Sequence, residues 1–349
     1  MHRDRIKSTV LSLSLTLLAL AACDRPRTWE NRVALPEPLT NNAVAAVAGP
    51  AGCTLYSAFG LDATRQRPGI HGRAFAWREG QAAWQALPDA PGLPRIATSG
   101  VALRGKFWVL GGYSIDVDDN ETSHTELVVY DPASNAWSSV SPLPVAIDDA
   151  MAVAWRDRYI VVVSGWSNTR PVPNVQIYDA DSDTWSAGTD FPGTAVFGGA
   201  AGLDGDDLYV IDGVGLDTVQ REFVIVNQTW RARLDPNNPT TIQWTSLGPH
   251  PGPARYRAAA GPAFGRVLFV GGTDNPYNYD GLSYDNNQPS APLASLFGID
   301  PRTGTFGALE TRPQATMDHR ALVGCGDAVY TVGGMTTGPN VVNWVLRLQ

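Results

Sequence analysis

Short apolar runs separated by turns recur along most of the chain. In the copy at 99–137, an apolar run ends in Gly111-Gly112, a polar loop follows, and the next run ends in Tyr130-Asp131 before Trp137. Runs of about five apolar residues bounded by glycine and turn residues are typical of buried strands. Each copy therefore predicts a small antiparallel sheet.

The same order of features occurs six times, with a period of about 50 residues. In the other copies the glycine and aromatic markers are Gly60 and Trp84, Ser164-Gly165 and Trp185, Asp212-Gly213 and Trp244, Gly271-Gly272 and Phe306, and Gly333-Gly334. Phe223–Val226 is the expected third strand of the fourth copy. This order resembles the Kelch motif, in which each repeat forms one blade of a β-propeller. The resemblance implies an all-β fold, a six-bladed Kelch propeller.

The sixth copy stops one strand short of a complete blade. Thr28-Trp29 offers the missing tryptophan, and the Leu-Pro-Glu-Pro segment 35–38 resembles the Leu-Pro at 143–144 that ends another blade. A last blade built from both ends of the chain would close the ring and protect its sheet edges. We therefore expect one domain, 23–349, with an N-terminal strand completing the last blade. Its predicted blades are 39–90, 91–144, 145–192, 193–250, 251–313, and 314–349 together with 26–38.

Residues 1–22 have the pattern of a bacterial lipoprotein signal peptide. Three basic residues precede an apolar run, 10–20, that is too short to span a membrane. The run leads into Ala21-Ala22-Cys23, which resembles the lipobox and implies a lipid on Cys23. That lipid would anchor the protein at the periplasmic face of a membrane, and Asp24 resembles an inner-membrane retention signal. An ordinary signal peptide with an incidental cysteine is the alternative.

Composition narrows the range of partners. The formal net charge is −8, and no basic stripe is available to neutralise phosphates, which argues against nucleic acid. No later segment is apolar enough to span a bilayer. We expect a monomer without a cofactor, anchored to the membrane only by its lipid.

Two cysteines remain once Cys23 is assigned to the lipid. In the Kelch alignment, Cys53 and Cys325 each fall at the hairpin between the first two strands of a blade. Their blades, the first and the last, are neighbours across the ring closure. The alignment therefore implies a disulfide that staples the seam. Two separate buried thiols are the alternative.

In propellers of this kind, the segments that enter the blades and the loops between second and third strands share one channel mouth. Here they hold Asn41, Asn42, Arg95, Asp148, Asp149, Phe197, 255–257, 318–320, Tyr113, 116–121, 166–170 and 274–280. Guanidinium groups suit carboxylates, and Asn, Asp and Tyr suit hydroxyls, so the mouth suits a small sugar or a sugar acid. The acidic stretch 116–121 lacks the spacing of an EF-hand loop, so no metal site is expected there.

The layout resembles the periplasmic N-acetylneuraminate mutarotases, a family of Kelch rings that interconvert sugar anomers. Local likenesses include 95–99, entering the second blade, and 193–195, entering the fourth. In that family the fourth blade carries a Glu and then an Arg after its second strand. Here the Glu position is Val214, and Asp217 and Arg221 match only with a shift. The resemblance thus implies a retained binding shape with a changed substrate or chemistry.

These considerations give a candidate site for a sugar mutarotase (epimerase), an isomerase that needs general acid and base help. The candidates for an anionic group are Arg95, Arg255 and Arg257, and those for the ring and hydroxyls are Tyr256, Tyr277 and Asn278. The acid/base candidates are Asp217, Arg221, Asp318 and His319.

Two other functions remain open. A non-catalytic Kelch scaffold could present the same mouth to a periplasmic protein or peptide. A copper-radical oxidase of the galactose oxidase type would need paired His and Tyr ligands and a Tyr–Cys crosslink. The histidines after the signal peptide are His71, His124, His250 and His319, and they are scattered over different copies. We therefore expect no metal.

Overall fold

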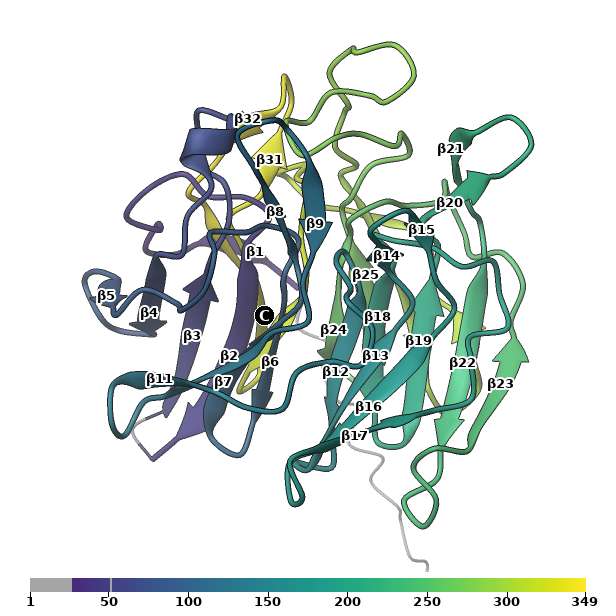
Figure 1. Ribbon diagram of the computed structural model, residues 1–349, viewed down its shortest axis with the longest axis horizontal. Helices are drawn as coiled ribbons and strands as arrows, with labels where there is room; N and C mark the ends of the chain where they lie inside the picture. The colour runs from purple at the N-terminus through teal and green to yellow at the C-terminus, as the bar shows by residue number, and fades with distance from the viewer. Residues whose placement is uncertain (1–26, 51) are drawn as a thin grey trace, which may run out of the picture.

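The computed structural model describes residues 27–349, apart from residue 51, and is built almost entirely of short antiparallel strands. The predicted signal peptide, the lipidated Cys23 and Asp24 lie outside these residues. Six sheets stand side by side as blades (Figure 1). Among the residues described, there is no helix long and apolar enough to cross a membrane.

Each blade is an antiparallel meander that contains four strands in chain order, except that the last takes its outer strand from the N-terminus. The first blade consists of β2 (Ala43–Gly49), β3 (Gly52–Ala58), β4 (Ala74–Arg78) and β5 (Gln85–Leu87). The second consists of β6 (Ser99–Leu103), β7 (Lys106–Leu110), β10 (Leu127–Asp131) and β11 (Ala136–Ser139). The third consists of β12 (Met151–Trp155), β13 (Tyr159–Val163), β16 (Val175–Asp179) and β17 (Thr184–Ala187).

The other three blades follow the same plan. The fourth consists of β18 (Ala200–Asp204), β19 (Asp207–Ile211), β22 (Thr229–Leu234) and β23 (Ile242–Ser246). The fifth consists of β24 (Ala259–Ala263), β25 (Arg266–Val270), β26 (Ser295–Asp300) and β27 (Thr305–Phe306), with β28 (Glu310–Thr311) also pairing with β26. The sixth consists of β29 (Val323–Cys325), β30 (Ala328–Val332), β33 (Val345–Leu348) and β1 (Trp29–Asn31).

The innermost strands of the blades form a closed ring. Strands β2, β6, β12, β18, β24 and β29 contact one another in that order, and β29 returns to β2. Largely small side chains on these strands, many of them alanine or glycine, line a cavity of about 270 Å³ along the axis. The sequence-based expectation of an all-β, six-bladed propeller is therefore confirmed.

The ring closes through the N-terminal strand, as expected. Strand β1 pairs antiparallel with β33, and Trp29 lies opposite Leu348. Trp29 also packs beside the guanidinium of Arg312, whose Cζ is 5.6 Å from the ring centroid. Because β1 covers the outer edge of β33, the last blade does not expose that edge for pairing with another chain.

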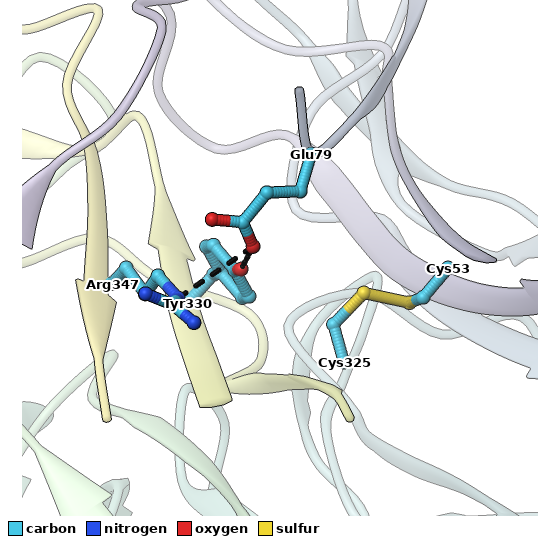
Figure 2. The surroundings of a disulfide bond; sticks show 5 residues. All are labelled: Cys53, Glu79, Cys325, Tyr330 and Arg347. Atoms are coloured by element: carbon cyan, nitrogen blue, oxygen red, sulfur yellow. Dashed lines mark hydrogen bonds and ion pairs between the residues drawn. A yellow bond between two sulfur atoms is a disulfide. The ribbon is translucent and has the colours of Figure 1, made fainter. Parts of the chain in front are cut away.

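A disulfide between Cys53 and Cys325 joins the first and last blades, which confirms the predicted staple (Figure 2). The two Cα atoms are 5.7 Å apart. Polar contacts cross the same seam: Tyr330 donates a hydrogen bond to Glu79, and Arg347 lies 3.6 Å from the Glu79 carboxylate (Figure 2). The seam is therefore held by a covalent bond and by side chains of both blades.

The tryptophans of the repeat pack against the preceding blade. The indole Nε1 of Trp137, on β11, donates to the carbonyl oxygen of Pro88 at 2.8 Å, just beyond the last strand of the first blade. Trp185, one blade further, donates to the carbonyl oxygen of Ser141 at the same distance. The indole thus buries apolar surface and satisfies a backbone carbonyl of the neighbouring blade.

The glycine doublet is required where two blades approach each other. Gly111 has a φ of 59°, in the left-handed region that favours glycine. A Cβ at this position would lie 2.2 Å from the carbonyl oxygen of Ile147, which belongs to the segment entering the next blade. Any side chain at Gly111 would therefore displace that entry segment.

The structure corrects one predicted strand. The third strand of the fourth blade is β22, Thr229–Leu234, and not Phe223–Val226. Phe223 instead belongs to β21 (Glu222–Ile225), which pairs with β20 (Val214–Asp217) as a separate hairpin. The apolar residues of 223–226 resemble a blade strand, but they pack at the mouth of the ring.

Small hairpins project from one end of the blades and form a rim there (Figure 1). Besides β20–β21 they are β8 (Tyr113–Ile115) with β9 (Glu121–Ser123), β14 (Trp166–Ser167) with β15 (Arg170–Pro171), and β31 (Met335–Thr336) with β32 (Asn340–Val341). The first blade has the short 3₁₀ turn η1 (Arg67–Gly69) in the corresponding loop, and the fifth has the long loop 271–294.

Candidate functional site

The site is built on six equivalent backbone positions, one in each segment that enters a blade. Each follows a residue that makes an isolated β-bridge, and each has a left-handed φ between 47° and 66°. The positions are Asn41, Ala97, Asp149, Gly198, Arg257 and Asp318. Left-handed conformations of larger residues are uncommon and need support from their surroundings. Here the support includes backbone hydrogen bonds between entry segments, such as Arg257 N–H to Gly198 O at 2.7 Å.

Three of these positions form a buried ion-pair network. Arg257 donates through Nη2 and Nε to Oδ2 of Asp149, at 2.5 and 3.1 Å, and its Nη1 is 3.3 Å from Oδ1 of Asp318. The rings of Tyr256 and Tyr277 lie beside the guanidinium, with their centroids 4.7 and 4.9 Å from Cζ. Arg257 therefore has a carboxylate on each side and two aromatic neighbours.

Asp318 is the most highly coordinated group of this network. Its side chain is fully buried, and its Oδ2 accepts hydrogen bonds from Thr40 and Asn41, each at 2.5 Å. Its Oδ1 accepts from the hydroxyl of Tyr277 at 3.1 Å. Satisfying a buried carboxylate in this way offsets much of the cost of removing it from water.

Arg320 adds a second cation to the network. Its Nη2 lies 2.9 Å from Oδ1 of Asp149 and 3.6 Å from Oδ1 of Asp318, and it also donates to Asn41. Arg320 borders the axial cavity of the inner strands, whereas Asp149 borders a second cavity at the rim. The network therefore lies across the channel, between the two cavities.

The rim cavity has a volume of about 160 Å³ and combines acidic with aromatic side chains. It is lined by Tyr113, Glu121, Asp148, Asp149, Trp166, Phe197, Phe223, Arg257, Asn278 and Tyr284. These residues come from the entry segments, the rim hairpins and the long loop of the fifth blade. An apolar wall with a few polar groups is the usual composition of a small-molecule site.

Two carboxyl groups of this cavity have raised pKa values. Burial raises the pKa of Asp148 well above its usual range, and the neighbouring Asp149 raises it further. The Ser123 hydroxyl donates to Oδ2 of Asp148 at 2.6 Å and opposes that shift. Glu121 lies on the rim with an exposed side chain. Partial desolvation by the surrounding protein raises the pKa of its carboxyl, and the nearby Arg257 opposes this shift. Carboxyl groups with raised pKa values suit acid and base chemistry near neutral pH.

Five of the sequence-predicted residues gather at this end of the channel. Arg257, Tyr256, Tyr277 and Asp318 belong to the network and its aromatic neighbours, and Asn278 lines the rim cavity. Burial raises the pKa values of both tyrosines well above the usual range, so their hydroxyls remain protonated.

The other predicted residues lie elsewhere. Arg255 is buried and donates to the carbonyl oxygens of Gly271 and Ser295, so it supports the fifth blade. Arg95 is buried beside the ring of Phe59, 4.5 Å from its centroid, and does not line the rim cavity.

His319 is also in a structural position. It is buried, and its Nε2 lies 2.7 Å from the hydroxyl of Thr316. Burial lowers the pKa of His319 well below its usual value, and the nearby Arg312 and Arg320 lower it further. The imidazole is therefore neutral at pH 7.

Asp217 and Arg221 lie at the tip of the β20–β21 hairpin. The Asp217 carboxylate accepts hydrogen bonds from the backbone N–H groups of Val219 and Gln220, which also lowers its pKa. Arg221 is exposed, with a φ of 60° in the turn. Neither side chain lines the rim cavity.

The residues of greatest chemical interest were not all chosen from the sequence. Asp148 and Glu121 fall in segments that were predicted to form the channel mouth. Nothing in the sequence indicates that Asp148 is buried or that the carboxyl of Glu121 is partly desolvated. Phe223 was misassigned to a blade strand. The partners of Arg320 become visible only when the entry segments of three blades are brought together.

The structure also bears on metal chemistry. Within 27–349, leaving out residue 51, no group of three or more His, Cys, Asp or Glu side chains is placed to hold a metal ion. Asp116 uses its carboxylate to accept from the backbone of Asp118 and Asn120 in the acidic turn. Cys53 and Cys325 are bonded to each other, so neither is available for a Tyr–Cys crosslink.

The fold and the repeated motif define a Kelch-type six-bladed β-propeller whose channel mouth holds an acidic, aromatic cavity. No family model matches the chain. The chain is 24% identical over 298 residues to an N-acetylneuraminate epimerase of Salmonella arizonae, an alignment that covers 72% of this chain and 75% of that protein. The corresponding protein of Salmonella typhi is 22% identical over 296 residues, with 72% and 74% covered.

A Kelch-like protein and a solved structure are similar to the chain as well. Kelch-like protein 35 of Mus musculus is 23% identical over 219 residues, which cover 63% of this chain but only 32% of the mouse protein. A solved structure of a protein called YjhT superposes with a TM-score of 0.72 at 15% identity, covering 90% of this chain and 99% of that one. The chain is therefore a Kelch-type propeller distantly related to N-acetylneuraminate epimerase.

Proposed function

We propose that this propeller binds a sugar ring in the rim cavity and accelerates exchange between its anomers. The observation that carries the proposal is the pair of carboxyl groups, Asp148 and Glu121, with raised pKa values in one aromatic-lined cavity. The distant relationship to proteins named N-acetylneuraminate epimerase supports the same class of chemistry. The lining also includes the aromatic side chains of Trp166 and Phe223, against which a sugar ring can pack.

Anomer exchange opens and recloses the ring at its anomeric carbon. One group donates a proton to the ring oxygen while another removes the proton of the anomeric hydroxyl. Asp148 is buried and has the more strongly raised pKa, so it is the proton donor in this scheme. Glu121 faces solvent at the rim and acts as the base. The Ser123 hydroxyl fixes the orientation of the Asp148 carboxyl.

The proposed place of this activity is the periplasmic face of a bacterial membrane. The proposal rests on the basic, apolar and Ala-Ala-Cys pattern of the first 23 residues, with lipid on Cys23 as the anchor. Mass spectrometry of the membrane fraction tests it. A mature N-terminus at Cys23 carrying acyl chains is expected, and an unmodified Cys23 would refute the anchor.

Binding and anomer exchange can be measured by NMR on the purified protein. The panel contains N-acetylneuraminate, a neutral hexose and an amino sugar. Saturation transfer reports binding, and exchange between the two anomeric signals reports catalysis. We expect exchange above the spontaneous rate for at least one sugar, and a loss of about 100-fold in Asp148→Asn. Asp118→Asn, in the exposed turn between β8 and β9, is the matched control and should behave as wild type.

The outcomes separate the two halves of the proposal. Binding without faster exchange would reduce the protein to a sugar receptor and refute the catalytic role of Asp148. No binding of any sugar in the panel would refute the proposal as a whole.

A non-catalytic protein-binding scaffold is the second candidate. The observation that favours it is the exposure of apolar side chains at two rim hairpins, Val117 (78%) and Val219 (90%). Exposed apolar groups around a mouth are common at protein interfaces. Pull-down from a periplasmic extract, compared with a Val117→Ser/Val219→Ser variant, tests this candidate. A partner captured equally well by both proteins would not use these tips.

A further inference from the structure

The charges at the rim cavity are unbalanced. Three of its lining residues, Glu121, Asp148 and Asp149, are acidic, and one, Arg257, is basic. Asp149 is paired with Arg257 and Arg320. Asp148 has the Ser123 hydroxyl as its donor, and Glu121 projects from β9 on the rim. The cavity therefore presents two carboxyl groups in excess of its cations.

The buried network next to the cavity does not make up for this excess. Its two cations, Arg257 and Arg320, are matched by its two carboxylates, Asp149 and Asp318. All four side chains are 4% exposed or less. A buried, paired guanidinium is a poor receptor for an incoming carboxylate, because its own partner would have to be displaced and left uncompensated.

The geometry around Arg257 strengthens this point. Tyr256 and Tyr277 lie within 5 Å of its Cζ, with their centroids at 4.7 and 4.9 Å. Its Nε and Nη2 both donate to Asp149, and its Nη1 reaches Asp318. A carboxylate of a ligand would therefore compete with Asp149 and Asp318 for this guanidinium, whose Nε–Nη2 side is already taken by Asp149.

We propose that the rim cavity selects a sugar that carries an amine and discriminates against sugar acids. This inference rests on the proposed function and specifies its ligand. A protonated amine would be attracted by the carboxylate of Glu121, and its charge would lower the raised pKa of Asp148 and so favour the ionised form of that carboxyl. The aromatic side chains of Trp166 and Phe223 line the same cavity and can contact the cation. The ligand class thus differs from the acidic sugar in the name of the Salmonella relatives.

Three sugars that share the gluco ring and differ in charge test the inference. The probes are D-glucosamine, N-acetyl-D-glucosamine and D-glucuronate, titrated separately into the full-length protein at pH 7 and low salt. We expect glucosamine to bind about tenfold more tightly than glucuronate, with the neutral sugar between them. Raising the salt concentration should reduce the difference, because it screens the rim charges.

Variants assign the preference to the two carboxyl groups. Glu121→Gln and Asp148→Asn should each reduce the ratio of glucosamine to glucuronate affinity by about threefold or more. Glu222→Gln, at an exposed position on β21 that does not line the cavity, is the matched control and should leave the ratio unchanged. Since Glu121 is exposed at the rim, its variant is expected to fold normally.

The result that overturns the inference is distinct from the result that overturns sugar binding. Glucuronate or N-acetylneuraminate binding as tightly as glucosamine would refute the charge selection and leave the proposed function standing. An affinity ratio unchanged in both variants would refute the role of Asp148 and Glu121. No binding of any sugar, whatever its charge, would refute the proposed function and the inference with it.

Discussion

Removing the disulfide between Cys53 and Cys325 is expected to lower the free energy of unfolding substantially. The two cysteines are 272 positions apart, so the bond closes a loop of most of the chain in the unfolded state. The chain-entropy model assigns such a loop about 5.6 kcal/mol, and loss of a native disulfide typically costs about 2–5 kcal/mol. We expect a loss of about 3 kcal/mol in the Cys53→Ser/Cys325→Ser variant, which is a large part of the stability of a typical domain.

The double variant should still fold, because other contacts hold the same seam. Strand β1 pairs with β33, and Glu79 contacts Tyr330 and Arg347 across the first and last blades (Figure 2). The disulfide therefore acts mainly by restricting the unfolded chain. The dependence of the unfolding free energy on urea should also steepen in the variant, since an unlinked chain exposes more surface when it unfolds.

Urea unfolding followed by tryptophan fluorescence measures both effects, and the chain has 11 tryptophans. Wild-type protein in reducing agent should reproduce the double variant, whereas the variant itself should not respond to the reductant. A loss below about 1 kcal/mol in both comparisons, with an unchanged urea dependence, would refute the reasoning. The noncovalent seam would then account for the ring closure without help from the bond.

Four further predictions concern single side chains. Burial raises the pKa of Asp148, so wild-type stability should fall as the pH rises from the ordinary Asp pKa of about 3.9 towards the raised pKa of the folded state; Asp148→Asn should melt higher than wild type at pH 8 but equally near pH 3, where the carboxyl is neutral in both states. Arg257→Met should cost about 3–5 kcal/mol in urea unfolding, because it removes one of the two cations that the buried carboxylates of Asp149 and Asp318 share. Trp29→Ala should cost about 2 kcal/mol in the same assay, since this partly buried ring anchors the closing strand. Arg221→Ala should change stability by less than about 0.5 kcal/mol and leave NMR-detected sugar binding intact, because the side chain is exposed at a hairpin tip.

The blades could be predicted from the sequence because their strands are short, apolar and repeated. Gly111-Gly112, Tyr130-Asp131 and Trp137 perform the same packing task in successive blades, so the same residue types recur. Ring closure could be predicted for a related reason. A missing outer strand leaves an edge that must be covered, and Thr28-Trp29 offers the missing marker.

The site could not be predicted in the same way. Its positions are equivalent in the fold, but they carry different residues, such as Asp149, Arg257 and Asp318, so no repeat pattern reveals them. Sequence position alone made Arg95 and Arg255 look equivalent to Arg257. Arg95 and Arg255 each lie two positions before the left-handed residue of their own entry segment, and their guanidinium groups are buried in the protein. Arg257 is itself that left-handed residue and lines the rim cavity.

The distribution of acidic groups around the ring offers the proposed anomer exchange a proton donor in a propeller that lacks the expected glutamate. The resemblance to the mutarotases places that glutamate at Val214, which is buried and packs against aromatic residues near Tyr256. The carboxyl groups with raised pKa values come instead from other parts of the ring. Glu121 belongs to the second blade, and Asp148 lies in the segment that enters the third. Glu121 and Asp148 line the rim cavity, and Val214 packs against Phe197 and Tyr256 beside it. We therefore expect that a proton donor can be moved between these positions without altering the ring. Introducing Val214→Glu into Asp148→Asn tests this equivalence: recovered anomer exchange would support it, and a folded variant that stays inactive would show that the chemistry depends on the Asp148 position itself.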